Sequence, residues 1–100
     1  MWVKSLETPG KVSPPEARSL SSSCVRLAPG QRVGEHSTED REELILVLEG
    51  EATLQAGGEA TLVRQRHAAY VPPGSRHDVE NRAGAPLVYV YVTARAAGKP

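Results

Sequence analysis

The chain has 100 residues, with twelve basic and twelve acidic side chains and a formal net charge of zero. This length is enough for one domain with a single hydrophobic core. The balanced charge, with no long run of one sign, argues against a nucleic-acid partner. The sequence has no apolar stretch of about eighteen residues, and its first residues lack the apolar segment of a signal peptide. We therefore expect a cytoplasmic protein with no membrane partner.

The sequence contains a single cysteine, Cys24. An intrachain disulfide is therefore excluded, and with no paired thiols the sequence gives no indication of a thiolate zinc site. Any metal binding or catalysis must rely on oxygen atoms and imidazole rings.

Eight prolines and nine glycines divide the chain into short segments, which favours strands over helices. Residues 1–17 are expected to form an irregular N-terminal arm that adds an edge strand to this domain or to a partner subunit. The domain itself is expected over residues 18–95, followed by a tail at 96–100. In chain order, strands are expected at residues 20–28, 31–38, 43–49, 51–56, 59–64, 68–71, 76–82 and 87–93. Short strands at this spacing are typical of an all-β sandwich or barrel.

One segment also fits a helix. Residues 37–49 contain no glycine or proline, begin with a potential cap at Ser37 and end before Gly50. Residues 44–48, however, are all apolar, which suits a strand covered on both faces better than an amphipathic helix. The apolar run therefore favours a strand.

Two polar segments carry the candidate chemistry. If the strands around the acidic pair Glu39 and Asp40 form a hairpin, His36 lies opposite Glu43, at a distance where their side chains meet. Strand periodicity then places Thr38 on the same face as His36. Farther along, a rigid turn at residues 72–74 leads into a strand that carries His77.

The spacing of these residues resembles the two sequence motifs of cupins, over residues 20 to 94. The first motif matches Gly30, His36, Thr38, Glu43 and Gly50, and the second matches Pro72, Gly74, His77 and Asn81. The resemblance implies a single-domain double-stranded β-helix, also called a jelly roll or cupin barrel, which commonly holds a metal ion by three histidines and a glutamate. Carried over by position, the metal ligands are His36, Glu43 and His77. Thr38 stands where cupins have the remaining histidine, and Arg66 replaces the glycine that usually opens the second motif.

Two histidines and one carboxylate match the facial ligand set of non-haem iron, and manganese, nickel or zinc also suit these atoms. The resemblance implies an enzyme that uses the metal on a small-molecule substrate, of dioxygenase or isomerase type. A metal-free alternative has Glu43 holding His36 as a general base for isomerisation. A further alternative is a module that only binds a small ligand.

The candidates for the substrate pocket are Thr38, Arg26, Tyr70 and Tyr89, with Tyr91 as a further tyrosine that could line it. We interpret His67, which stands among polar residues, as a surface side chain. A homodimer is expected because residues 44–48 and 87–92 are almost entirely apolar, and so short a chain has little material to cover both strands. Small cupins are commonly dimeric, which agrees.

Overall fold

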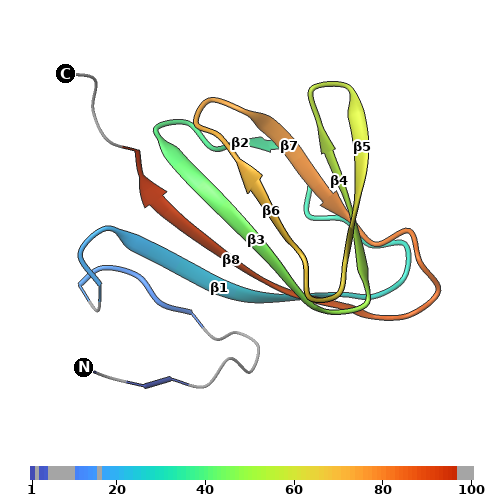
Figure 1. Ribbon diagram of the computed structural model, residues 1–100, viewed down its shortest axis with the longest axis horizontal. Coiled ribbons are helices and arrows are strands. Elements are labelled where there is room, and N and C mark those ends of the chain that lie inside the picture. The colour runs from blue at the N-terminus through green and yellow to red at the C-terminus, as the bar shows by residue number, and fades with distance from the viewer. Residues whose placement is uncertain (2, 5–10, 16, 97–100) are drawn as a thin grey trace.

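The computed structural model describes all residues except 2, 5–10, 16 and 97–100 (Figure 1). The described residues form eight strands and no helix, which confirms the all-β prediction. Across these residues, no helix is long and apolar enough to span a lipid bilayer. The strands are β1 (Leu20–Leu27), β2 (His36–Ser37), β3 (Arg41–Glu49), β4 (Glu51–Ala56), β5 (Glu59–Arg64), β6 (Ala68–Val71), β7 (Arg76–Glu80) and β8 (Leu87–Arg95).

The strands form two four-stranded antiparallel sheets, in the orders β1-β8-β3-β6 and β2-β7-β4-β5. Each sheet turns one face toward the other, and the apolar side chains of these inner faces meet in the core. Burying them removes apolar surface from water, which is the main favourable free energy of folding. The buried core consists of Leu27, Ile45, Val47, Ala52, Leu54, Val63, Val71, Val79, Leu87 and Tyr89.

The segment that also fitted a helix is the strand β3, which lies between β8 and β6. Its residues alternate as strand geometry requires. Ile45 and Val47 are buried in the core, whereas Leu44 and Leu48 are 38% and 46% exposed on the outer face. The five consecutive apolar residues therefore lie on both faces of the strand. Described residues fully cover only the inner face.

The expected hairpin between residues 31–38 and β3 is wrong. Only His36–Ser37 forms a strand there, and it pairs with β7, so that His36 lies opposite His77. β3 belongs to the other sheet, where Glu43 lies opposite Val71 and Thr93. The chain between β2 and β3 crosses from one sheet to the other instead of folding back on itself. Because of this crossing, β3 lies between β8 and β6, and alternate residues of β3 point into the core.

The N-terminal arm pairs with the domain through Val12. Val12 forms an isolated bridge with Ser22 of β1, with backbone hydrogen bonds of 2.8 and 2.7 Å in the two directions. Much of the predicted arm, and residues 97–100 of the predicted tail, lie outside the described residues. The arm and tail boundaries therefore stay predictions.

Gly50, between β3 and β4, should be more sensitive to substitution than other glycines of the same backbone conformation. Its φ is 81°, and a Cβ atom there would overlap the backbone oxygen of Pro86. Gly58 has a similar φ of 78° but open space around it. Gly58→Ala should lower the free energy of unfolding by roughly 1–2 kcal/mol, the cost of a left-handed backbone. Gly50→Ala should cost clearly more in urea denaturation, and equal losses would contradict this packing constraint.

Candidate metal centre and its cavity

His36 of β2, Glu43 of β3 and His77 of β7 come together between the two sheets. One ring nitrogen of each histidine and one carboxylate oxygen of Glu43 all lie within 4.8 Å of one another. The two histidines are neighbours because β2 pairs with β7, and their ring centroids are 4.3 Å apart. Glu43 approaches them from the opposite sheet. The three candidates from the sequence are thus brought together by a different strand pairing from the one we expected.

Backbone carbonyl groups hold both imidazole rings. His36 Nδ1 lies 2.8 Å from the Gly34 carbonyl oxygen, and His77 Nδ1 lies 3.1 Å from that of Ser75. A carbonyl oxygen can only accept a hydrogen bond, so each Nδ1 must carry the proton when the ring is neutral. The Nε2 atoms then keep a free lone pair, as in the histidine ligands of metal sites, whose other nitrogen is typically anchored in this way.

His77 Nε2 is a buried polar atom with no hydrogen-bond partner among the described residues. Such an atom normally costs about 1–3 kcal/mol and calls for an explanation. Its nearest charged neighbour is Glu43 Oε2, at 3.5 Å. Ligand atoms around a metal ion with bonds of about 2.0–2.2 Å lie roughly 3 Å or slightly more from one another. The free lone pair and this separation fit a divalent cation, although the full spread of 4.8 Å requires small side-chain rotations.

A cavity of about 460 Å³ opens beside these residues. This volume lies within the range of small-molecule sites, roughly 300–1,000 Å³. Valine and tyrosine side chains make most of its wall, and no lysine or arginine is among the described residues that line it. His77 lies behind this wall, fully buried. The lining residues are Val25, Val33, Gly34, Glu35, His36, Glu43, Val79, Tyr89 and Tyr91.

Tyr89 is a candidate pocket residue that does lie at the cavity, unlike Thr38, Arg26 and Tyr70. It is 3% exposed and lines the cavity from β8. Burial, and then the negative charge of Glu43, raise the pKa of Tyr89 well above its ordinary value. The hydroxyl group therefore stays protonated at neutral pH and can donate a hydrogen bond.

Thr38, Arg26 and Tyr70 lie away from this cavity. The Thr38 hydroxyl group donates to the Pro72 carbonyl oxygen at 2.7 Å and accepts from the Ser75 N–H at 3.0 Å, so it joins two turns. Arg26 is exposed on β1, whose inward positions are taken by the neighbouring residues. Tyr70 is 57% exposed on β6 and donates to Glu42 at 2.9 Å.

Tyr91, a further pocket candidate from the sequence, lines the cavity two positions after Tyr89 on β8, as strand periodicity predicts. Sequence reasoning missed other lining residues. Val33, Gly34 and Glu35 belong to an irregular segment, where periodicity carries no information about direction. Only the folded structure places them at the cavity.

Residues 23–93 match the Cupin domain family. Among curated proteins, the chain is 30% identical over 98 residues to the tetracenomycin polyketide synthase protein TcmJ of Streptomyces glaucescens. That alignment covers 98% of this chain but only 64% of TcmJ. The chain therefore spans less than two thirds of the length of this relative.

Two solved structures show a similar fold. The protein TT1209 of Thermus thermophilus superposes with a TM-score of 0.81 at 27% identity, over 95% of this chain and 98% of that one. A cupin 2 conserved barrel domain protein of Salinispora arenicola gives a TM-score of 0.80 at 24% identity, over 96% and 90% of the two chains. With the two antiparallel sheets, these findings confirm the predicted double-stranded β-helix. Because the family match covers most of its length, the chain belongs to the Cupin domain family.

Proposed function

We propose that this chain binds a divalent metal ion through His36, Glu43 and His77 and acts on a small molecule in the adjoining cavity. The observation that carries the proposal is the buried His77 Nε2, which has no hydrogen-bond partner among the described residues and lies 3.5 Å from Glu43 Oε2. The anchoring of both Nδ1 atoms supports it, since it leaves the opposite nitrogens available as ligands. Iron, manganese, nickel and zinc all suit this donor set.

Each residue has a distinct part in the proposed site. A bound metal ion supplies Lewis-acid polarisation of a substrate oxygen or, if it is redox-active, chemistry with dioxygen, which fits an isomerase or a dioxygenase. The Gly34 and Ser75 carbonyl groups hold the imidazole rings in one orientation. Glu43 contributes a negative charge from the opposite sheet. Tyr89 donates a hydrogen bond to an oxygen atom of the substrate.

The cavity favours a neutral and largely apolar substrate. Val25, Val33 and Val79 line it together with two tyrosines, and no lysine or arginine from the described residues is there to bind an anion. Oxygen atoms on the substrate would meet His36, Glu43 and Tyr89 at the polar part of the wall. The name of TcmJ associates that relative with a polyketide synthase. We propose a substrate of this general kind, with apolar rings that carry carbonyl or hydroxyl groups.

A second candidate function is metal-free acid–base catalysis of an isomerisation, or simple binding of a ligand. The approach of His77 Nε2 to Glu43 Oε2 at 3.5 Å favours it, because it places two groups that can accept or donate a proton side by side. The sequence suggested His36 as the partner of Glu43, whereas this close contact involves His77. Metal content distinguishes the two candidates.

Protein purified without a histidine tag should bind about one equivalent of divalent metal per chain. His36→Ala and Glu43→Gln should each lower the affinity at least tenfold, about 1.4 kcal/mol, in a competitive titration. His77→Gln should do the same, with circular dichroism to check that the fold is retained. His67→Ala is the matched control, because His67 is exposed and is not part of the cluster. If all three site variants bind metal like the parent, the ligands lie elsewhere.

Tyr89 should make the stability of the protein fall at high pH. Below pH 10 its hydroxyl group is protonated in both the folded and the unfolded chain. Above pH 10 only the unfolded chain releases the proton, so the free energy of unfolding should fall by up to about 1.4 kcal/mol per pH unit. Tyr89→Phe should remove this contribution to the slope in urea denaturation between pH 9 and 11. Tyr70→Phe should change the slope less, because the hydrogen bond to Glu42 that raises the pKa of Tyr70 is exposed and screened by solvent. Equal slopes in the parent and Tyr89→Phe would contradict the raised pKa.

We propose further that the chain forms a homodimer through the outer face of the sheet β1-β8-β3-β6. Leu44, Leu48 and Tyr70 are between 38% and 57% exposed on this face. Light scattering at tens of micromolar should give the mass of a dimer for the parent and of a monomer for a Leu44→Glu, Leu48→Glu variant. Leu62→Glu, at a residue 48% exposed on β5 of the other sheet, should leave the dimer intact. A monomeric parent would refute this assignment.

A further inference from the structure

The chain just before His36 contains a bulge. Arg32 pairs with Glu80 in an isolated bridge, and His36 pairs with His77. The four residue steps from Arg32 to His36 therefore lie opposite the three steps from Glu80 to His77 on β7. The segment between Arg32 and His36 thus contains one residue more than the strand it faces. Gly34, with a φ of 110°, lies inside this stretch. Bulges of this kind redirect side chains and are common beside functional sites.

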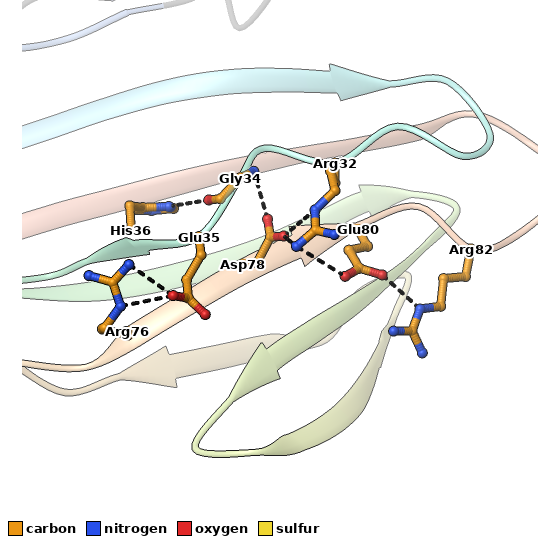
Figure 2. Close-up of polar contacts among 8 residues, drawn as sticks. All are labelled: Arg32, Gly34, Glu35, His36, Arg76, Asp78, Glu80 and Arg82. Atoms are coloured by element: carbon orange, nitrogen blue, oxygen red, sulfur yellow. Dashed lines mark hydrogen bonds and ion pairs between the residues drawn. The ribbon is translucent and has the colours of Figure 1, made fainter.

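Asp78 of β7 holds this bulge from the opposite strand. Its side chain is 2% exposed. One oxygen, Oδ1, accepts the Gly34 N–H at 2.8 Å, and the other, Oδ2, accepts Arg32 Nε at 2.6 Å (Figure 2). We call Arg32 and Asp78 the clamp. It satisfies a backbone N–H that the bulge would otherwise leave unpaired, and it does so with charge-assisted hydrogen bonds.

The residue that the clamp holds is also the one that orients His36. Gly34 donates its N–H to Asp78 and accepts His36 Nδ1 at its carbonyl oxygen, 2.8 Å away (Figure 2). Val33, Gly34 and Glu35 line the cavity as well. Movement at Gly34 would therefore change both the direction of the His36 ring and the shape of the cavity wall.

A second ion pair reaches the same segment but is much more exposed. Glu35 Oε1 lies 2.8 Å from Arg76 Nη2, with side chains 60% and 65% exposed. Exposed pairs contribute about 0–1 kcal/mol and are screened by salt. The carboxylate of Asp78 is only 2% exposed, so the loss of its charged partner costs more free energy than the loss of an exposed pair. The clamp therefore dominates the restraint on this segment.

From this geometry we infer that Arg32 and Asp78 are positioning residues, which fix the bulge at Gly34 and thereby the tautomer and direction of His36. The consequence for metal affinity rests on the proposed function above, whereas the consequence for the His36 ring does not. Neither residue belongs to the set of candidate ligands.

Arg32→Ala is the principal test, because the Arg32 side chain is 60% exposed and its loss leaves the core intact. Nitrogen-15 NMR of the histidine rings in metal-free protein should show His36 as the Nδ1–H tautomer in the parent and a mixture of tautomers in the variant. The His77 signals should stay unchanged, because Ser75 anchors that ring. Metal affinity should fall about fivefold or more. Arg32→Lys, which retains one charged donor, should recover part of both effects.

Arg82→Ala is the matched control. Arg82 is 54% exposed and pairs with Glu80 at 2.7 Å, next to the clamp but outside the hydrogen bonds that Asp78 makes with Arg32 and Gly34. Asp78→Asn is the second test variant. It keeps an acceptor for Gly34 but loses the charge that holds Arg32, so it should reproduce the effect of Arg32→Ala on the His36 signals.

The outcomes separate the two proposals. If His36 in Arg32→Ala and Asp78→Asn gives the same ring signals as in Arg82→Ala, the positioning role is refuted, whether or not the parent binds metal. If the ring signals change as expected but the parent binds no metal, the clamp is supported and the proposed metal function fails.

Discussion

The pairing of β2 with β7 is the constraint on which the site depends. It sets His36 against His77 in one sheet, and the facing sheet then supplies Glu43 across the core. β2 has only two residues, so its own hydrogen bonds are too few to fix its position. Its placement relies on the neighbouring segments, where the Val33 N–H bonds to the Val79 carbonyl oxygen and the Thr38 N–H to that of Ser75. A short strand is thereby held from both ends.

Among the described residues, buried polar side chains other than His77 have hydrogen-bond partners, which makes the unpartnered His77 Nε2 informative. Asn81, 1% exposed, donates to the carbonyl oxygens of Leu27 and Ala85 and accepts from the N–H of Ala83. Thr38 and Asp78 likewise use their polar atoms fully in hydrogen bonds. Against this background, an unpartnered His77 Nε2 stands out among the described residues. A buried atom left without a partner in an otherwise satisfied interior is a reason to look for a ligand there.

The two faces of the sheet that contains β7 carry different polar groups. The cavity between the sheets combines an apolar wall with the histidine and glutamate side chains. The opposite face of β7 carries Asp78 and Glu80, and Arg32 contacts both carboxylate groups there (Figure 2). Because side chains alternate along a strand, His77 and Asp78 turn to opposite sides of the same sheet. On one side, β7 thus supplies the candidate ligand His77. On the other side, its Asp78 restrains the second candidate ligand, His36, through Gly34.

The fold class, most of the strands and the three candidate ligands could be predicted from the sequence alone. β4, β5 and β6 lie where they were expected, because glycine turns and local alternation are properties of short segments. The candidate ligands followed from motif spacing, which does not depend on knowing how the strands pair. The choice of Tyr89 for the pocket came from residue type alone, as did Tyr70 and Arg26, which lie away from the cavity.

Strand pairing, and the partners of the buried polar groups, became known only from the folded chain. A local pattern assigns a residue to a face, but it cannot say that β2 pairs with β7 instead of β3, because that choice is made by packing across the core. For the same reason, no sequence pattern indicated that the Thr38 hydroxyl group joins two turns. The clamp joins Arg32 to Asp78, 46 residues farther along the chain, and such a contact exists only after the sheet has formed.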